Sequence, residues 1–457
     1  MPVLSYQRKW SEFEATNSEY VLILEEIQFN IDNVKRHNKP KSVPAPAVAL
    51  PGRAFRQAEA KGPVLVISPF NFPMNLALVP FAAAIACGNP AVLRPSSSTP
   101  HCAAYMQTLI TRCLDPTLYR CIRCSHSVAD SLLAKSWGHI FFTGSVNVGR
   151  HIARLAAETL TPVTLELGGQ SPTIVTDTAN IATAAQRVAL GKAFNAGQVC
   201  VAPNHAIVCA SVYDEFVSKL KAAFTSFYGK DAQASPHFGR IVSDREWRRL
   251  NTLVEAEREA GTTVTQFGSP CLDDRFYPPT ILEGCTLTGP CMQNELFGPV
   301  LPVFKVPNVQ QALAFLESQP WCQADVNAKP LALYLFSTSK KEHRMFIRHT
   351  SSGGVTINDT MIHVFSAELP FGGVGTSGMG TYHHHASLDT FSHHKPVLQR
   401  HSPNTPVDTL LRQPPHKLAP VTFKHPSLAT LSSSAVWTGL GVVAGIAVGA
   451  GLVLALT

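Results

Sequence analysis

One cysteine lies where the chain is expected to form a constrained loop. Cys200 follows Gly197, which permits a tight turn, and it precedes Pro203, which resists continuation of a preceding helix. A thiol held in such a loop can act as a nucleophile once it ionises. The chain has 11 cysteines, and taken alone any one of them fits a structural thiol better than a reactive one. Which of these two interpretations applies to Cys200 depends on the residues around it.

Two polar residues could serve beside such a thiol. Glu166 ends the run VTLE, and a carboxylate among apolar side chains can have its pKa raised toward neutrality, which suits a general base. Asn71 has an amide that can donate a hydrogen bond to developing negative charge. The alternatives are a surface carboxylate at a strand end for Glu166 and a turn-forming residue for Asn71.

A glycine-containing turn predicts a phosphate site. Gly144, Ser145 and Gly149 of TGSVNVG follow the apolar run HIFF and open a helical stretch. The N-terminus of a helix presents free N–H groups that favour phosphate. A glycine turn by itself is a weak signal, and its place between a strand and a helix strengthens the prediction.

The elements that would position these residues alternate in type between residues 64 and 175. Helices are expected at Pro73 to Cys87, Thr99 to Cys113 and Val146 to Glu158, with strands at VLVI, AVLR, HIFFTG, VTLEL and TIV. Pro73 suits the start of the first helix and Gly88 its end. Helices at 212–226 and 244–259 and a strand at 331–337 continue the pattern. We predict an α/β fold with a mostly parallel sheet covered on both faces.

Five separated motifs resemble the aldehyde dehydrogenase superfamily, in particular its class 3 or fatty aldehyde dehydrogenase branch, over roughly residues 20–400. They are PFNFPMNLALVPFAAAIACGNPAVLRPS (69–96), FFTGSVNVG (141–149), TLELGGQSP (164–172), FNAGQVCVAP (194–203) and ELFGPVLP (295–302), and they occur in the family's order. The stretch LPFGGVGTSGMGTYH (369–383), followed by FSHHKP, is similar to the class 3 branch.

The resemblance implies NAD(P)-dependent oxidation of an aldehyde to a carboxylic acid. Cys200 would be the nucleophile, forming a thiohemiacetal and then a thioester, and Glu166 would activate the hydrolytic water. Asn71 would stabilise the oxyanion together with the backbone N–H of Cys200. The turn Leu369 to Gly373 would line the mouth of the site.

The resemblance also implies which residues bind the cofactor, NAD or NADP. Glu295 would hold a ribose, and Phe297 would pack near the nicotinamide. The full set is Arg94, Ser97, Gly144, Ser145, Gly149, Leu167, Gly168, Glu295 and Phe297. The family usually has Lys and Glu where this chain has Arg94 and Ser97. Since that Glu disfavours a 2′-phosphate, its replacement by Ser97 predicts that NADP is tolerated alongside NAD. Gln170 replaces another Lys of the family, which we expect to be peripheral.

We expect a mainly Rossmann-like NAD(P)-binding domain at 1–175 and an α/β catalytic domain containing Cys200 at 176–370. A C-terminal arm at 371–399 would close the site and the dimer, and a flexible tether rich in Pro, Ser, Thr and His would occupy 400–434. By resemblance the partner is a second copy, in a homodimer. The chain begins later than typical class 3 members, which predicts that one or two leading helices are missing.

Residues 435–456 predict a single C-terminal transmembrane helix. The segment is 22 residues without a charge, which as a helix would span about 33 Å, enough to cross a bilayer. A buried soluble helix is disfavoured because the segment is rich in glycine. A glycolipid-attachment signal would require a signal sequence, and the N-terminus shows none. Gly441, Gly445 and Gly449 are spaced for close helix pairing, although so glycine-rich a segment produces this spacing easily by chance.

The predicted tail anchor has consequences for location and substrate. The enzyme body would face the cytosol, with the endoplasmic reticulum as the expected membrane and the mitochondrial outer membrane or peroxisome as alternatives. Medium- and long-chain fatty aldehydes are the expected substrates, since a membrane presents them. The alternatives are a catalytically silent membrane scaffold with the same fold, or a dehydrogenase of small or aromatic aldehydes.

Composition weighs against other classes of partner. The formal charge of +7 comes from scattered Lys and Arg, so no nucleic acid partner is expected. The cysteines show neither a disulfide framework nor paired zinc spacing, and Cys121 and Cys124 fall in an apparent strand. The histidines at 383–385 and 393–394 have no companion carboxylate at ligand spacing, so a polar surface turn is expected there and no metal.

Overall fold

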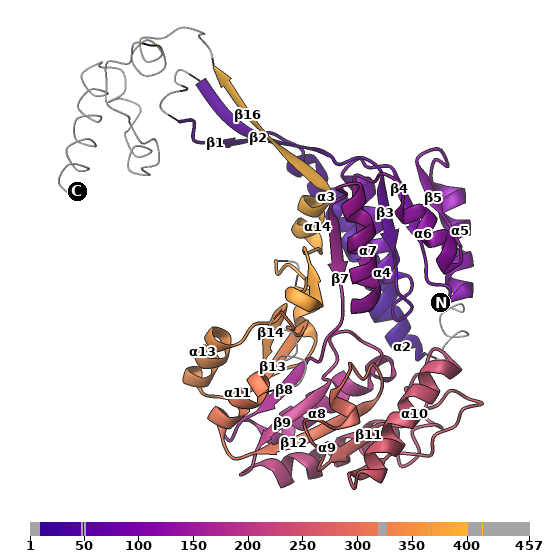
Figure 1. The fold of residues 1–457 in the computed structure, drawn as a ribbon, viewed down its shortest axis with the longest axis vertical. Helices are drawn as coiled ribbons and strands as arrows, with labels where there is room; N and C mark the ends of the chain where they lie inside the picture. Colours follow the sequence, from indigo (N-terminus) through magenta and orange to yellow (C-terminus); the bar gives the residue numbers. More distant parts are fainter. Residues whose placement is uncertain are drawn as a thin grey trace, which may run out of the picture. The chain divides into compact units, whose positions relative to one another are not determined.

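A computed structural model describes residues 10–46, 49, 52–318, 327–366, 368–400 and 414. The chain divides into two compact units, of which the larger comprises Met1–Val34 and Ala60–Ser392 and the smaller Lys35–Glu59 and His393–Thr457. The larger unit holds both of the large sheets and all of the predicted site residues (Figure 1).

The first large sheet has six strands in the order β15-β7-β6-β3-β4-β5. The strands β3 to β7 are parallel to one another, and β15 pairs antiparallel at the edge beside β7. Their bounds are β3 Val64–Ile67, β4 Ala91–Arg94, β5 Tyr119–Cys121, β6 His139–Thr143, β7 Val163–Glu166 and β15 Gly378–Met379. The chain therefore starts at the centre of the sheet, runs outward to β5, and returns to build β6 and β7 on the other side of β3 (Figure 1).

Helices cover both faces of this sheet because successive strand residues point to opposite sides. Val64, Val66 and Phe141 pack with α4 and α5, whereas Leu65 and Ile140 pack with α6 and α7. The bounds of these helices are α4 Asn75–Ala86, α5 Pro100–Cys113, α6 His126–Leu133 and α7 Val146–Glu158. On the α4 side the core also includes α14 (His384–Thr390) from the far end of the chain.

The second large sheet has seven strands in the order β10-β11-β12-β9-β8-β13-β14. All are parallel except the edge strand β10. Their bounds are β8 Pro172–Val175, β9 His205–Cys209, β10 Thr263–Gln266, β11 Thr280–Glu283, β12 Val300–Val306, β13 Ala332–Phe336 and β14 Gly354–Ile357.

This sheet is also covered on both faces. One face packs against α8 (Ile181–Ala193), α9 (Tyr213–Tyr228) and α10 (Asp244–Glu259), and the other against α11 (Val309–Ser318) and α13 (Lys340–His349). Short 3-10 turns lie between the larger elements: η3 Phe194–Gly197, η4 Pro290–Met292, η5 Ile362–Phe365 and η6 Gly375–Ser377.

The N-terminal region of the larger unit is helical, with α2 at Glu12–Ala15, a π-helical turn η1 at Thr16–Val21 and α3 at Leu22–His37. In the smaller unit, β1 (Lys41–Val43), β2 (Gly52–Ala60) and β16 (Ser392–Arg400) form a three-stranded sheet in that order. An ion pair between Lys395 and Glu59 joins two of its strands.

The predicted α/β fold with mostly parallel sheets is confirmed. The helix predicted from Pro73 begins two residues later, at Asn75, and Gly88 follows its end with a left-handed φ of 81°. One local expectation was wrong, because only Cys121 lies in a strand and Cys124 follows it in a loop. The predicted domain boundaries stay a prediction.

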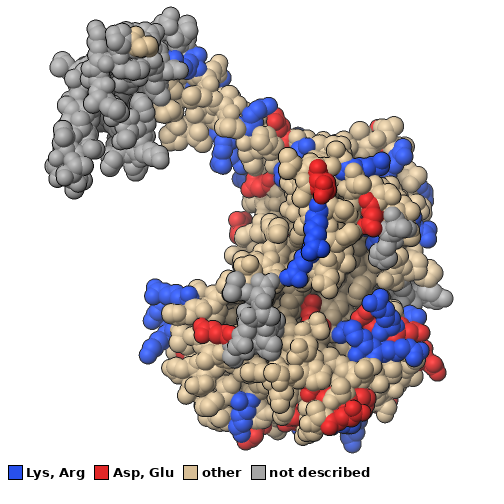
Figure 2. All heavy atoms as spheres, in the orientation of Figure 1, with Lys and Arg blue, Asp and Glu red and all other residues tan. Residues whose placement is uncertain are grey.

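Two C-terminal predictions fall on other parts of the chain. Nearly all of the tether at 400–434 and the whole segment 435–456 lie outside the described residues. Among the helices that are described, none combines the length and apolar character needed to cross a bilayer. On the face drawn in Figure 2, acidic and basic side chains are interspersed over the described surface and form no single basic stripe.

Candidate active site

Four of the predicted site residues lie at or just after the carboxyl ends of parallel strands. Asn71 follows β3, Ser145 follows β6, Arg94 ends β4 and Glu166 ends β7. The connections reverse direction between β3 and β6, which lie side by side although five elements separate them along the chain. In open α/β sheets, ligands bind in the crevice at such a switch point. The topology therefore brings together residues that the sequence spreads over nearly 100 positions.

Cys200 is half-buried and lies in the connection between α8 and β9. Just before it, Asn195, Ala196 and Gly197 have φ values of 50°, 50° and 72°, three successive left-handed conformations. A Cβ on Gly197 would lie 2.2 Å from the carbonyl oxygen of Gly298. Glycine is therefore required at this position for two reasons, the backbone conformation and the close approach of another loop. Non-glycine residues in such conformations cluster at functional sites.

Two side chains that the sequence analysis missed hold this loop in place. Asn195 Nδ2 donates to the carbonyl of Asn71 at 2.9 Å, which ties the loop to the segment after β3. Gln198 Nε2 donates to the carbonyls of Asn195 and Arg240, both at 3.0 Å, and its Oε1 accepts from the N–H of Val242 at 2.9 Å. The loop that carries Cys200 is thus held by buried hydrogen bonds to several parts of the fold.

The electrostatic surroundings of Cys200 favour the thiol over the thiolate in the cofactor-free protein. Burial, followed by the negative charges of Glu295 and Glu166, raises the pKa of Cys200 to about 12. The backbone N–H groups of Cys200 and Val201 act in the opposite direction because they donate toward the sulfur. The same N–H of Cys200 is the donor expected for the oxyanion.

Glu166 is buried, with 2% of its surface exposed, and it lies close enough to Cys200 to influence its titration. Neither carboxyl oxygen has a hydrogen-bond partner within the described part of the chain. Burial accordingly raises the pKa of Glu166 well above its usual value. A buried carboxyl group without protein partners, next to a cysteine, is suited to accept a proton from water.

Glu295 is a second carboxyl group near Cys200. Its Oε2 would be only 2.0 Å from a Cβ on Gly168, so the missing side chain at Gly168 gives this carboxylate its room. Burial raises the pKa of Glu295 to about 8, against hydrogen bonding from Gly169 and the positive charges of Lys192 and Arg249. The pKa of Lys192, a residue 1% exposed on α8, is lowered by burial to about 7.

The segment that carries Glu295 and Phe297 is anchored by side chains from three other elements. Asn204 Oδ1 accepts from the N–H of Leu296 at 2.9 Å, and Arg249 Nη2 donates to the carbonyl of Leu296 at 2.6 Å. Gln170 Nε2 donates to the carbonyl of Met292 at 2.9 Å. The ring of Phe297 meets that of Phe70 edge to face, with centroids 5.7 Å apart. Gln170 is thus a buried anchor of this segment and not the peripheral residue expected from the sequence.

The turn at the start of α7 fits a phosphate-bearing cofactor. Ser145 is the N-cap residue of α7, and its side chain makes no capping hydrogen bond to the helix. Gly149 lies in the first turns of α7, where a Cβ would be 2.6 Å from Leu167, so this glycine allows the helix to pack closely on the end of β7. A Cβ on Gly144 would likewise meet the ring of Phe142, at 2.4 Å. These are the features of a strand-turn-helix dinucleotide site.

Arg94 and Ser97 have different environments. Arg94 is buried at the end of β4, where Nη2 donates to the carbonyl of Cys124 at 3.4 Å and Nε has no partner in the described structure. Ser97 is exposed in the following turn. The pair therefore offers one fixed cation and one small accessible hydroxyl at the edge of the sheet.

The segment before α14 pairs with the strand that ends at Glu166. Gly378 of β15 pairs with Glu166, and the N–H of Leu167 donates to the carbonyl of Ser377 at 3.0 Å. Phe371 forms an isolated antiparallel bridge with Tyr382. Burial, followed by the negative charges of Glu166 and Cys200, raises the pKa of the Tyr382 phenol. The predicted turn Leu369 to Gly373 thus belongs to a segment that reaches the site.

The histidines near the C-terminus differ from the surface turn that we expected. His383, His384 and His385 are half-buried at the start of α14, and the second histidine pair, 393–394, lies in β16. The missing carboxylate comes from Glu26 on α3, more than 350 residues away along the chain. Sequence spacing could not reveal this companion.

Further residues of the site had only faint signals in the sequence. Lys192 is a charged residue in an otherwise apolar stretch of α8, and Tyr334 is a phenol within the apolar run of β13. Tyr334 Oη donates to the carbonyl of Val201 and so fixes the residue after the cysteine. A single polar residue in an apolar element is the signal that could have identified both.

Comparison with known proteins agrees with this geometry. Residues 11–397 match the aldehyde dehydrogenase family. The 4,4'-diaponeurosporen-aldehyde dehydrogenase of Staphylococcus aureus (strain NCTC 8325 / PS 47) is 38% identical over 407 residues, covering 89% of this chain and 86% of that protein. Aldehyde dehydrogenase family 3 member B1 of Homo sapiens is 38% identical over 405 residues, 89% and 84% of the two chains. The dimeric NADP-preferring aldehyde dehydrogenase of Mus musculus is 39% identical over 391 residues, 85% and 83%.

Solved structures show the same fold. The substrate-bound state of Staphylococcus aureus AldH superposes with a TM-score of 0.84 at 37% identity, covering 88% of this chain and 86% of that one. Two structures at 23% identity and a TM-score of 0.73 each cover 82% of this chain. They are a succinic semialdehyde dehydrogenase of Streptococcus pyogenes with NADP+, 80% covered, and an indole-3-acetaldehyde dehydrogenase with NAD+, 75% covered. Because the family match spans almost all of the described residues, this chain belongs to the aldehyde dehydrogenase family, as an enzyme whose cofactor is NAD or NADP.

Proposed function

We propose that Cys200 is the nucleophile of this enzyme, Glu166 the base for the hydrolytic water, and Asn71 with the N–H of Cys200 the oxyanion site. The observation that carries the assignment is the buried carboxyl of Glu166, without a hydrogen-bond partner in the described structure and electrostatically coupled to a cysteine on a strained loop. This pair has the chemistry that thioester formation and hydrolysis need.

The reaction begins when Cys200 loses its proton to solvent and its sulfur attacks the carbonyl carbon of the aldehyde. The carbonyl electron pair moves onto oxygen, where the Asn71 amide and the N–H of Cys200 hold the oxyanion. As the carbonyl re-forms, the hydrogen on that carbon leaves with two electrons, and a thioester to Cys200 remains. Glu166 then takes a proton from water, whose oxygen attacks the thioester carbon. The carbon–sulfur bond breaks, which releases the carboxylic acid and restores Cys200.

NAD or NADP, when bound, supplies the acceptor for the two electrons and the hydrogen. We propose that the N-terminus of α7 with Ser145 holds the phosphates, that Glu295 holds a ribose, and that Leu167, Gly168 and Phe297 surround the cofactor. Arg94 retains a cation near the adenosine end, and Ser97 adds no negative charge there. We therefore expect kcat/KM for NADP within about tenfold of that for NAD, a difference of about 1.4 kcal/mol. Steady-state kinetics that show a much stronger preference for NAD would contradict this.

Medium- and long-chain fatty aldehydes are the proposed substrates. The proposal rests on residues 435–456, 22 uncharged residues that could cross a bilayer as a helix and would hold the enzyme where such aldehydes partition. We propose that the enzyme body faces the cytosol, at the endoplasmic reticulum, and that the enzyme is a homodimer. Similarity to a mouse enzyme described as dimeric supports the last point.

The assignment of Cys200 is tested with purified protein, hexadecanal and either cofactor. Cys200→Ser should reduce kcat by at least about 1000-fold, since a hydroxyl ionises far less readily than a thiol. Cys209→Ser, at a buried cysteine in β9, is the control and should keep most of the activity. The acyl adduct should appear by mass spectrometry on the Cys200 peptide.

Other outcomes distinguish the alternatives. Comparable turnover in the parent protein and Cys200→Ser would remove the proposed nucleophile. Absence of turnover in the parent with hexadecanal, benzaldehyde and acetaldehyde would favour a catalytically silent scaffold. Efficient turnover of the two small aldehydes alone would leave the mechanism intact and reject the fatty-aldehyde assignment.

A further inference from the structure

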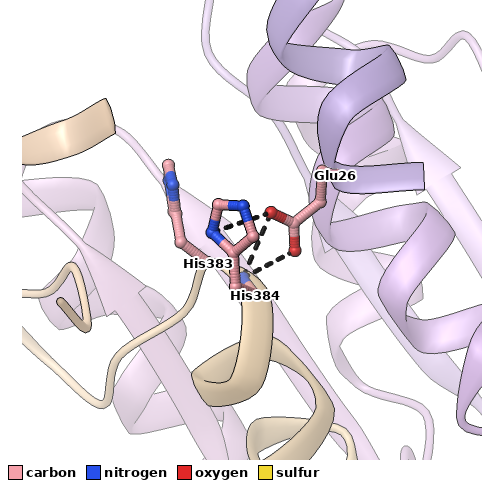
Figure 3. Close-up of side chains that lie close together, drawn as sticks. All are labelled: Glu26, His383 and His384. Atoms are coloured by element: carbon pink, nitrogen blue, oxygen red, sulfur yellow. Dashed lines mark hydrogen bonds and ion pairs between the residues drawn. The ribbon is translucent and has the colours of Figure 1, made fainter. Parts of the chain in front are cut away.

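Two histidines and a glutamate meet outside the catalytic site, within the larger unit. Glu26 projects from α3, while His383 and His384 stand at the start of α14 (Figure 3). One side-chain atom from each residue, a carboxylate oxygen or a ring nitrogen, lies within 4.8 Å of those of the other two. Glu26 is only 2% exposed, so a carboxylate has been buried beside two imidazoles.

The contacts within this cluster leave Nδ1 of His384 without a hydrogen-bond partner among the described residues. Glu26 accepts the backbone N–H of His384 through Oε1 at 2.8 Å and through Oε2 at 3.1 Å. Nδ1 of His384 is buried and lies 3.6 Å from Glu26 Oε2, which is too far for a good hydrogen bond. It has no hydrogen-bond partner in the part of the chain that the structure describes. The nitrogen and the carboxylate thus face each other across a gap.

The width of that gap suits a metal ion. Two ligand atoms that each lie about 2.1 Å from a zinc ion in tetrahedral geometry are about 3.4 Å apart. The observed 3.6 Å between Nδ1 of His384 and Oε2 of Glu26 is close to this value. A small pocket borders the cluster and is lined by Glu26, His383 and His384 together with Glu25 and Asn75. That space accommodates a water molecule as a further ligand.

The backbone at the two histidines is strained, and their rings are fixed in place. His383 and His384 have φ values of 76° and 50°, which residues other than glycine rarely adopt. The ring of His383 stacks edgewise on Tyr382, with centroids 4.2 Å apart, and that of His384 contacts Phe29, at 4.7 Å. Strained residues with tightly packed side chains are typical of a functional constraint.

We propose that Glu26, His383 and His384 bind one divalent first-row transition metal ion, with zinc as the expected metal and water completing the coordination. Imidazole nitrogens favour zinc, cobalt, nickel and copper, whereas magnesium and calcium favour sites built from oxygen. The ion would link α3 to the segment that follows Tyr382. This site needs neither Cys200 nor Glu166, so the proposal stands apart from the proposed mechanism.

The test uses the full chain, stripped with a chelator and titrated with CoCl2 and ZnCl2. We expect one equivalent of Co2+ to give the visible absorption of a tetrahedral ion, Zn2+ to displace it, and Zn2+ to raise the melting temperature. A second candidate cluster, Glu257 with Cys285 and Cys291, also offers donors. Binding there would produce thiolate charge-transfer absorption in the near ultraviolet and would be lost in Cys285→Ser.

Variants assign the ligands. His384→Gly should lower Co2+ affinity at least tenfold, and glycine suits the left-handed backbone at that position, so the variant is expected to fold. His383→Asn, which also tolerates positive φ, should do the same. His385→Ala is the control, because this ring packs on Phe29 but is not in the cluster, and affinity should stay within about twofold.

Three results would overturn the proposal. Folded His384→Gly that retains full affinity would show that the ion binds elsewhere. Binding that disappears in Cys285→Ser would assign it to the thiol cluster. Absence of binding in the parent protein would mean that Glu26 and His384 form only an ion pair, with a proton in place of the metal.

Discussion

At the scale of single residues, burial dominates the chemistry of the site. It is the largest cause of the raised pKa of Cys200, Glu166 and Glu295, and of the lowered pKa of Lys192. Each group is therefore displaced toward its neutral form in the cofactor-free protein. A thiol and a carboxyl group that are both protonated can lie close together without repulsion, which makes this arrangement compatible with a folded resting state.

Glu166→Gln should stabilise the protein at alkaline pH while it removes activity. Burial raises the pKa of Glu166 in the folded protein. The contribution of this carboxyl group to stability is therefore fully present below its pKa in the unfolded chain, and it is lost as the pH rises through its pKa in the folded protein. Glutamine does not titrate. Above about pH 4.5 the free energy of unfolding of Glu166→Gln should therefore rise relative to that of the parent protein, by at most about 1.4 kcal/mol per pH unit. Turnover should fall by about 100- to 10,000-fold.

Thermal unfolding of Glu166→Gln and the parent protein between pH 5 and 9 measures this difference. The exposed Glu158→Gln serves as the control and should follow the parent protein at every pH. Parallel curves for Glu166→Gln and the parent would show that the carboxyl of Glu166 is not perturbed by burial.

At the scale of elements, the site depends on loops whose backbone has positive φ angles, which are energetically unfavourable for residues other than glycine. The loop at 195–197 has three successive left-handed residues, and Phe297 in the facing loop has a φ of 46°. The two loops touch at Gly197 and Gly298. Long helices and buried strands supply the rigid support, and the short strained connections place the proposed nucleophile and Phe297.

Gly197→Ala tests how closely the two loops must approach. The new Cβ would lie 2.2 Å from a backbone oxygen that cannot move independently, so kcat/KM should fall about 100-fold or more. Gly229→Ala is a matched control, since Gly229 also has a positive φ (77°) but nothing lies within 4 Å of a Cβ there. It should lose about 1 kcal/mol of stability and keep its activity. Equal losses of activity would show that strain, and not the contact, is responsible.

At the scale of the whole molecule, the chain combines an enzyme body with a distinct C-terminal segment. Both large sheets and the site belong to the larger unit, whereas the described residues 393–400 belong to the smaller one together with residues 35–59. The apolar run 435–456 comes after about 35 residues rich in Pro, Ser, Thr and His. This order separates the proposed anchoring function from the catalytic one.

Removal of residues 435–457 should release the enzyme from membranes without altering its chemistry. We expect the full chain to stay in the membrane pellet after alkaline extraction, and the chain ending at residue 434 to appear in the supernatant. In detergent, kcat with a short-chain aldehyde should agree within about twofold, since none of the proposed catalytic residues is lost. Extraction of the full chain into the supernatant would exclude a spanning anchor.

The sequence by itself determined the order and type of most elements, and it is the source of the proposal that Cys200 is the nucleophile and Glu166 the base. It could do so because these properties are local: the strands of residues 64–175 are apolar runs, the helix ends carry Pro73 and Gly88, and the motifs around Glu166 and Cys200 are contiguous. The helix expected at 244–259 has those bounds in the structure for the same reason.

Only the tertiary structure decided which distant residues meet. Glu295 needs the space left by Gly168, Asn195 connects to Asn71, and Glu26 faces His384 across more than 350 positions. These contacts follow from the order of strands in the sheets and from the approach of loops and helices from different parts of the chain. The shifted pKa values are also tertiary in origin, because burial is a property of the packed molecule and not of a motif.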